Sequence, residues 1–413
     1  MLFRQEPILF QITYIILLLC MCSIPITSAL LLPAGIALWS ISLVHFFKIE
    51  KGTCLKNREN NIFFSLYLLF FLLNFIALFY SHNKTIAFSR MEYYLWFFIA
   101  PPLFLVLDSQ KMTRKRIENL LFTFLISMAF IILLNYAVSY KFFLETHSSY
   151  HFFYASLSHF MHPSYQALYA CIALLFSFYF ITKRRCMVLF ILFSLVLLLY
   201  VFMLQSKSGI FAAILFLVFA GLYVMNRKKI RYIFSVVFVV VFLAIPVFLV
   251  KNIHTKINRV DNFIESLKKA RENENYTDTR VLIWKNAWEV AVENLPFGTG
   301  IGDVHDALNR TYEANGFPAL HERNYNAHNQ YLETLIGSGI LGLLSLLSLF
   351  IFPFIYGVKN RDILLSVFVL IVLFFLLFES MLERKAGGDF IALFLALLFY
   401  MSKLEIDVER KYY

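Results

Sequence analysis

A histidine lies where a polar stretch of the chain meets a long apolar one. In residues 325–350, YNAHNQYLETLIGSGILGLLSLLSLF, a polar segment ends at His328 and a hydrophobic helix is expected to begin directly after it. His328 should therefore lie at the water-facing, positive end of a membrane helix, where the helix field keeps an imidazole neutral and able to accept a proton. Backbone N–H groups at such an end also suit an anion such as phosphate. A simple boundary histidine is the alternative interpretation.

Two basic residues could neutralise such an anion. Arg280 follows a capping-type sequence, 277–279, and opens an amphipathic segment, so its guanidinium could bind a phosphate with two parallel hydrogen bonds. Lys207 lies in the short turn QSKS between two apolar segments, where a lysine is favourable beside an anion or a polar cavity. The alternatives are a solvated loop arginine and a lysine that extends to the lipid headgroups.

Acidic and histidine residues near the same membrane face are weaker candidates. The acidic ones are Glu333, Glu379, Glu383 and Asp389, and the simplest hypothesis pairs each with a nearby cation such as Arg384 or Lys385. Histidines spaced three or four apart, as in 147/151 and 159/162, could chelate a metal, but no cysteine or carboxylate stands at a fixed spacing from them. We therefore predict no metal and no cofactor.

The composition predicts an all-α, polytopic integral membrane protein. The chain has 413 residues, 60% of them hydrophobic, and its mean hydropathy is +0.70. Apolar runs long enough to cross about 30 Å of hydrocarbon recur along its whole length. We expect about twelve spans, at 8–24, 27–47, 61–81, 91–108, 118–138, 164–182, 186–204, 209–225, 232–250, 329–357, 363–380 and 389–403.

Charge patterning gives an orientation. Loops on one side of the twelve spans hold 17 Lys and Arg residues, and the short loops on the other side hold 6. The positive-inside rule then places both termini in the cytoplasm. The net charge of +11 comes from these loops and is not a nucleic-acid signal. The five cysteines fall in spans or cytoplasmic loops, so we expect no disulfide.

One large outward-facing insert interrupts the spans. The chain divides into spans 1–9 (1–250), a large, partly helical loop (251–328) on the periplasmic or extracellular side, and spans 10–12 with a cytoplasmic tail (329–413). Within the loop we expect a charged helix at 256–275 and an amphipathic helix at 280–293. Val281, Trp284, Trp288 and Val292 share one face of the second helix. We expect its tryptophans to anchor the loop to headgroups, and residues 139–163 to form a second, aromatic outer loop. Glycines at 337, 339 and 342 should let a neighbouring helix approach closely.

Three motifs together resemble a known family. They are R-x-x-x-W beginning at Arg280, LPFGTGIG at 295–302, and HNQYL-x6-G-x-x-G beginning at His328. With the twelve-span layout, they resemble the O-antigen ligase and O-antigen polymerase superfamily. The resemblance implies a metal-independent, inverting glycosyltransferase of the bacterial inner membrane that uses a glycan on undecaprenyl diphosphate.

The resemblance also implies roles for individual residues. His328 would be the general base, and Arg280 would contact the donor diphosphate and contribute to catalysis. Lys207 stands where the family often has a second arginine, which keeps the charge but loses the planar fork. Glu379 matches an acidic residue near the end of the penultimate span, and Asn329 is a further candidate supporting residue.

The sequence favours a ligase that transfers the glycan to lipid A–core on the periplasmic face. A polymerase, with a lipid-linked repeat unit as acceptor, is the alternative. A polysaccharide or lipid transporter would need coupling residues within the spans, and none stands out. A non-catalytic scaffold would not explain a Lys, an Arg and a His on one face of the membrane.

Overall fold

The computed structural model describes residues 8–49, 58–109, 112–225 and 280–412, and these contain helices and no strand. The longer helices are α1 Ile8–Ser23, α2 Leu31–Ile49, α3 Arg58–Tyr80, α4 Lys84–Ser109, α5 Arg114–Thr146, α6 Pro163–Thr182, α7 Met187–Met203, α8 Lys207–Met225, α10 Arg280–Glu293, α11 Val304–Ala314, α13 Gln330–Lys359, α14 Ile363–Phe378 and α15 Lys385–Tyr412. Short helical turns are η2 Ser149–Phe152, η3 Tyr154–Ser156, α12 Pro318–Glu322 and η4 Met381–Glu383.

The all-helical prediction is confirmed for these residues. Five helices are long and apolar enough to cross a membrane, and five shorter apolar helices accompany them. Helices occupy the positions of eleven predicted spans, whereas 232–250 lies outside the described residues, so the total of twelve stays a prediction. The charged helix expected at 256–275 also lies outside them.

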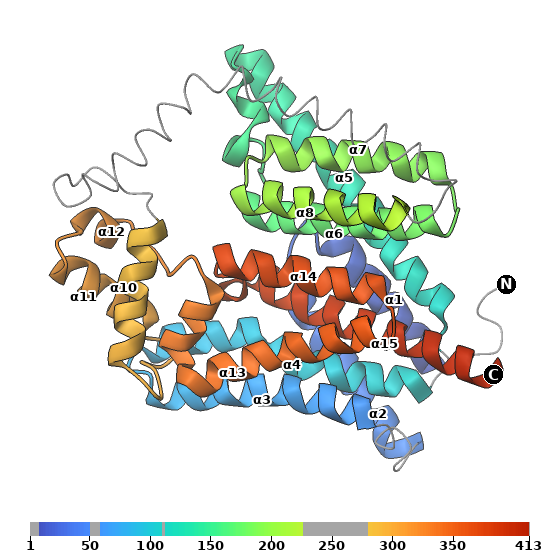
Figure 1. Ribbon diagram of the computed structural model, residues 1–413, viewed down its shortest axis with the longest axis horizontal. Helices are drawn as coiled ribbons and strands as arrows, with labels where there is room; N and C mark the ends of the chain where they lie inside the picture. Colours follow the sequence, from blue (N-terminus) through green and yellow to red (C-terminus); the bar gives the residue numbers. More distant parts are fainter. Residues whose placement is uncertain (1–7, 50–57, 110–111, 226–279, 413) are drawn as a thin grey trace.

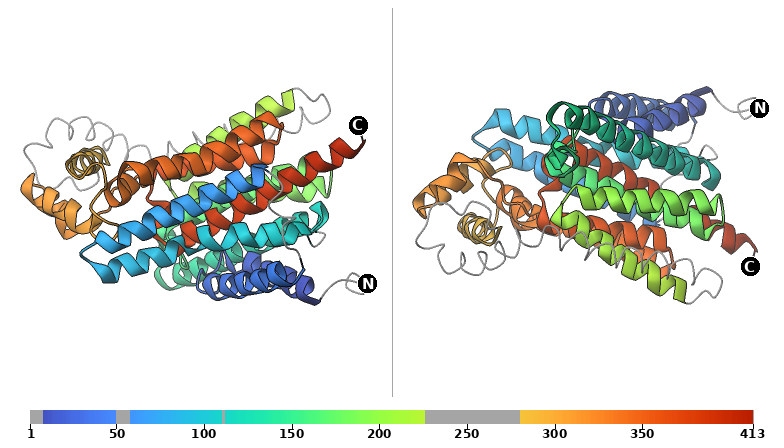
Figure 2. Two further views of the ribbon diagram at one scale, coloured as in Figure 1. Left: turned by 90° about the horizontal axis from the view of Figure 1, so that it is seen from below. Right: turned by 90° about the horizontal axis from the view of Figure 1, so that it is seen from above.

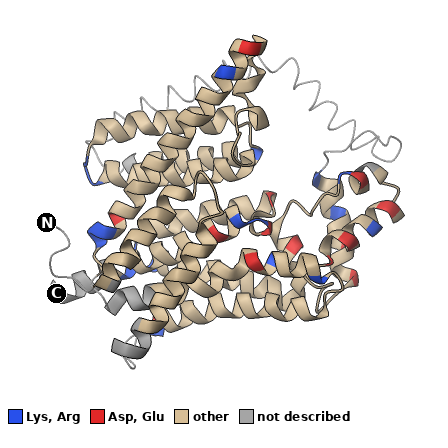
Figure 3. Cartoon of the chain, turned by 180° about the vertical axis from the view of Figure 1, so that it is seen from behind, with Lys and Arg blue, Asp and Glu red and all other residues tan. Residues whose placement is uncertain are grey.

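The apolar helices run side by side, and the insert sits at one end of them. Figure 1 shows α10, α11 and α12 together at that end, with α10 lying across the direction of α3, α4 and α13, and Figure 2 shows α10 almost end-on. The start of α1 and the end of α15 lie at the opposite end (Figures 1 and 2). Charged residues are sparse along the middle of the helices, and they lie near the insert and at other helix ends (Figure 3).

Two helices form the centre of the bundle. The apolar windows of α6 and α15 are each 94% buried, against 33% for α3. Helix α6 packs on α7, α8 and α14, and α15 packs on α4. The start of α6 therefore has a fixed position, and α14, which packs on α6, ends near that start.

The glycine motifs of the insert and of α13 pack against each other. Gly339 breaks α13 with φ 68°, and a side chain there would lie 2.0 Å from the carbonyl oxygen of Pro296. A side chain on Gly298 would lie 2.5 Å from the carbonyl oxygen of Ile336. That carbonyl, freed by the break, accepts a hydrogen bond from the Thr299 N–H at 2.7 Å. The close neighbour at this break is therefore the 296–300 loop, not the helix that the sequence suggested.

One further expectation needs correction, and the structure adds detail to another. Helix α5 continues to Thr146, so the aromatic outer loop begins after it and not at 139, because apolar residues extend the helix until His147 ends it with φ 53°. Helix α10 forms as predicted, but it packs through Ile283, Ala287, Val290 and Ala291. The face with Val281 and Trp288 is outward, with 50% and 57% of those residues exposed.

Candidate active site

Three of the sequence candidates meet at one carboxylate. Glu379 Oε1 lies 2.8 Å from an Nη of Arg280, and Glu379 Oε2 lies 3.2 Å from Nδ1 of His328. The Ser164 hydroxyl also donates to Glu379 Oε1, at 3.1 Å. The side chains of Arg280, His328 and Glu379 are 25%, 27% and 14% exposed, so the cluster is held by protein yet open to a ligand.

Each of these side chains lies at the end of a helix. Glu379 caps the C-terminus of α14 in an extended conformation, φ −147° and ψ 143°, which turns it out of the helix. Arg280 is the first residue of α10, and Ser164 is in the first turn of α6. His328 precedes α13 with φ 45°. Helix ends from four parts of the chain therefore meet, as is common where side chains must face a ligand.

The contacts of Glu379 keep it ionised. Burial raises the pKa of Glu379, but the hydrogen bond with His328 and the charge of Arg280 together lower that pKa below its ordinary value. With its proton on Nδ1 and donated to this carboxylate, the imidazole has Nε2 left to accept another proton. Glu379 thus sets the orientation and tautomer of His328, a role that the sequence alone did not reveal.

Asn329 and Lys207 have different places. Asn329 caps α13, with its side-chain oxygen accepting from the N–H groups of Tyr331 and Leu332 at 2.9 and 3.1 Å, so it fixes the helix end that carries His328. Lys207 is exposed at the start of α8, in the turn that the sequence predicted. Its neighbour Gly209 packs on Ala167 of α6, one turn from Ser164. The described contacts do not join Lys207 to the carboxylate cluster.

His162 and Ser164, which the sequence analysis did not assign to the site, border it. His162 caps α6, its Nδ1 accepting from the Ser164 N–H at 3.3 Å. Partial desolvation lowers the pKa of His162, the charge of Glu379 raises it, and Arg384 and His328 lower it further, with a net decrease. The one sequence signal was a His-Pro pair before a span, since proline favours the first turn of a helix.

A second, buried charge cluster lies beside the site. Arg90 of α4 contacts Glu333 at 3.2 Å and Glu383 at 2.8 Å, and the Tyr94 hydroxyl donates to Glu383 at 3.0 Å. The charged side chains are 6%, 1% and 7% exposed respectively. The expected pairing of these two carboxylates with Arg384 or Lys385 is therefore wrong. Helix α4 begins at Lys84, so Arg90 lies within it and not in a loop.

The buried cluster holds both loops of the site. Glu333 Oε2 accepts from the backbone N–H of Ala327 at 3.0 Å, directly before His328. The Ser380 hydroxyl, directly after Glu379, lies 3.5 Å from the same oxygen. Burial raises the pKa of Glu383 to about 7, more than the charge of Arg90 lowers it. One arginine between two carboxylates leaves an excess negative charge, which protonation of Glu383 removes.

Other expected chemistry can be compared with the described residues. Among them no group of three or more His, Cys, Asp and Glu side chains is placed to hold a metal. The four described cysteines, Cys20, Cys22, Cys171 and Cys186, are free, and Cys54 lies outside the described residues.

One family model matches part of the chain. Residues 192–347 match the family model described as O-Antigen ligase (Wzy_C), a stretch that holds Lys207, Arg280 and His328 and ends before Glu379. No curated protein matches the chain. This match supports the O-antigen ligase superfamily of glycosyltransferase-like membrane enzymes, whose functions are of the ligase or polymerase type, for this part of the chain.

Proposed function

We propose that this chain is an O-antigen ligase. It transfers a glycan from undecaprenyl diphosphate to the lipid A–core oligosaccharide at the periplasmic face of the bacterial inner membrane. The observation that carries the proposal is the contact of Glu379 with both Arg280 and His328, because it combines a base with an anion-binding group in one partly exposed cluster.

His328 acts on the acceptor. Its Nε2 takes the proton of an acceptor hydroxyl as that oxygen attacks the anomeric carbon of the donor sugar. His328 Nδ1–H donates to Glu379 Oε2, with 3.2 Å between the nitrogen and the oxygen, and the carboxylate stabilises the imidazolium that forms. A new C–O bond forms on the face opposite the leaving group, so the anomeric configuration inverts.

Arg280 acts on the donor. The bond between the anomeric carbon and the diphosphate oxygen breaks, and its electron pair leaves with undecaprenyl diphosphate. Among the described residues, one Nη of Arg280 donates to Glu379 Oε1, and a guanidinium has further N–H groups that the diphosphate could use. Lys207 supplies a second positive charge from the start of α8, so charge neutralisation needs no divalent cation.

The test is transfer by purified protein in lipid vesicles with EDTA present. The donor is an undecaprenyl diphosphate-linked glycan, the acceptor is lipid A–core or nothing added, and the products are separated on a gel. Glycan on lipid A–core is the expected result. A ladder of longer lipid-linked glycans without added acceptor would replace the ligase with a polymerase that uses the same residues. Intact protein without either product would overturn transfer altogether.

A further inference from the structure

A basic cavity lies at the end of the bundle opposite the candidate active site. Helix α14 carries Glu379 after its last residue, and the cavity includes Ile363, its first. Sixteen helical residues separate the two ends, a distance of about 24 Å at 1.5 Å per residue. The cavity is therefore a separate feature at the other membrane face, which charge patterning assigns to the cytoplasm.

The cavity is amphipathic. Its volume is about 150 Å³, and it lies between the end of α6 and the start of α14, with Arg114 of α5 beside it. Its apolar lining residues are Leu175, Phe178, Ile363 and Leu364, and its charged lining residues are Arg114, Lys183, Arg361 and Asp362. Such a cavity suits a ligand with an anionic head and a hydrocarbon body.

Carboxylates offset only part of the positive charge of the residues that line the cavity. Arg114 contacts Glu118 at 3.5 Å and the Tyr179 hydroxyl at 2.9 Å, and Glu118 also pairs with Arg185 at 2.7 Å. Lys183 and Arg361 are exposed. In the part of the chain that the structure describes, neither has a carboxylate within ion-pair distance.

One acidic residue also lines the cavity. Asp362 Oδ1 accepts from the Leu365 N–H at 3.0 Å and so caps α14. The ammonium of Lys183 lies 5.6 Å from the centroid of the Tyr179 ring, which forms part of the cavity wall. Arg114, Lys183 and Arg361 thus outnumber Asp362 among the charged residues that line this gap between α6 and α14.

We propose that this cavity binds an anionic phospholipid. Its phosphate would contact Lys183 and Arg361, and its glycerol and upper acyl carbons would lie against Phe178 and Leu364. Basic pockets between membrane helices recognise anionic headgroups in this way. The lipid would join α6 to α14, the two helices whose opposite ends meet through Ser164 and Glu379.

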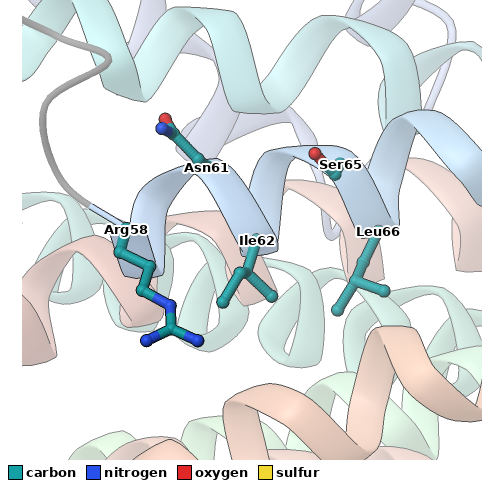
Figure 4. A pocket seen from close by; sticks show the side chains of 5 residues that line it. All are labelled: Arg58, Asn61, Ile62, Ser65 and Leu66. Atoms are coloured by element: carbon teal, nitrogen blue, oxygen red, sulfur yellow. The ribbon is translucent and has the colours of Figure 1, made fainter.

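A second hollow at the same end provides a matched control. It follows one face of α3, is about 440 Å³, and is lined by Arg58, Asn61, Ile62, Ser65 and Leu66. Figure 4 shows Arg58, Ile62 and Leu66 pointing to one side of the helix. It has one cation among its lining residues where the proposed lipid site has three.

The experiment uses the full chain, delipidated in detergent, with native mass spectrometry and thermal unfolding as readouts. Phosphatidylglycerol, phosphatidylethanolamine and inorganic phosphate are added separately. We expect phosphatidylglycerol to be retained most strongly and to raise the Tm. Each cation removed should weaken its binding roughly fivefold, so Lys183→Gln with Arg361→Gln should lose the preference. Arg58→Gln should keep most of it.

Four outcomes would overturn the proposal. They are equal retention of the two lipids, an unchanged preference in the double variant, an equal loss in Arg58→Gln, or the same Tm increase from inorganic phosphate alone. The last would assign the cavity to a free anion. The charge-preserving pair Lys183→Arg and Arg361→Lys separates loss of the site from loss of folding, because it should retain the preference. None of these readouts depends on glycan transfer.

Discussion

Two charge clusters of similar composition lie side by side near the insert, yet they differ in exposure and in charge balance. In the outer cluster, Arg280 and Glu379 are 25% and 14% exposed, and a histidine completes the group. In the inner cluster, Arg90 is 6% exposed and its carboxylates are 1% and 7% exposed. A ligand can reach the first, whereas protein seals the second.

The difference assigns different tasks to similar side chains. The outer cluster balances one arginine against one carboxylate, so a bound anion can still use the guanidinium. The inner cluster has two carboxylates for one arginine, and one of them also holds the Ala327 N–H. Its contacts position the loops on which His328 and Glu379 stand. We expect substitutions in the outer cluster to change transfer and those in the inner cluster to change stability.

The largest effect should come from His328→Ala. A positioned general base contributes about 10²- to 10⁴-fold to the rate, so the initial rate of glycan transfer in vesicles should fall by that factor. The Tm should change little, because the His328 side chain is 27% exposed. A transfer rate within a few-fold of wild type would contradict the division of tasks between the clusters, since the outer cluster would then not contain the base.

Arg90→Gln should cause the largest loss of stability. It leaves two carboxylates buried without a cation, and removing one partner of a buried ion pair costs about 3–5 kcal/mol. A strong decrease in Tm, measured in detergent, is expected, while the partly exposed Arg280→Gln should lower Tm much less. Adding Glu383→Gln to Arg90→Gln should restore part of the loss. Equal Tm changes for Arg90→Gln and Arg280→Gln would contradict the division of tasks.

Glu379→Gln should reduce transfer by about 10²-fold, the cost of a misplaced reacting group. The amide loses the charge that orients Nδ1 of His328 and stabilises its protonated form. Combined with His328→Ala, it should add almost nothing, because residues that act as one unit are not additive. Rate constants for the two single variants and the double variant test this. If the rate reductions of the two single variants multiply in the double variant, Glu379 does not act through His328.

The sequence predicted the outer candidates because helix ends and charged residues in an apolar chain are conspicuous. His328 was found from its place before a long apolar run, and Arg280 from its place before an amphipathic one. Glu379 was one of four acidic candidates near that membrane face, and only the resemblance singled it out, since nothing local indicates that a residue after α14 meets one before α13. Sequence separations of 51 and 99 residues join it to His328 and Arg280.

The inner cluster could not be predicted. The predicted span 91–108 left Arg90 in the loop before it. In the structure the helix begins six residues before Arg90, at Lys84. Its partner Glu333 is 243 residues away. The sequence analysis assigned the glycine motif of α13 to helix packing. It could not show the break at Gly339, because that break depends on the 296–300 loop that packs against it. Local patterns thus located the elements, and contacts between distant elements decided the pairings.

The smallest effect, and the one that separates the clusters by sign, is their dependence on pH. Burial raises the pKa of Glu383 to about 7 from 4.5, so between these values the folded chain keeps a proton that the unfolded chain has lost. Stability should therefore fall as pH rises through this window. Glu383→Gln cannot ionise, so its Tm relative to wild type should increase from pH 4.5 to 7.

Glu379 should show the opposite behaviour. Its pKa is lowered, so its contribution to stability is present above its ordinary value of 4.5 and is lost as pH falls below it through the folded-state pKa. Glu379→Gln should thus lower the Tm at neutral pH and converge with wild type in acid, where Glu383→Gln also matches wild type. Parallel Tm profiles for Glu383→Gln and wild type between pH 4.5 and 7 would contradict this. They would mean that Glu333 and Glu383 both stay ionised beside Arg90.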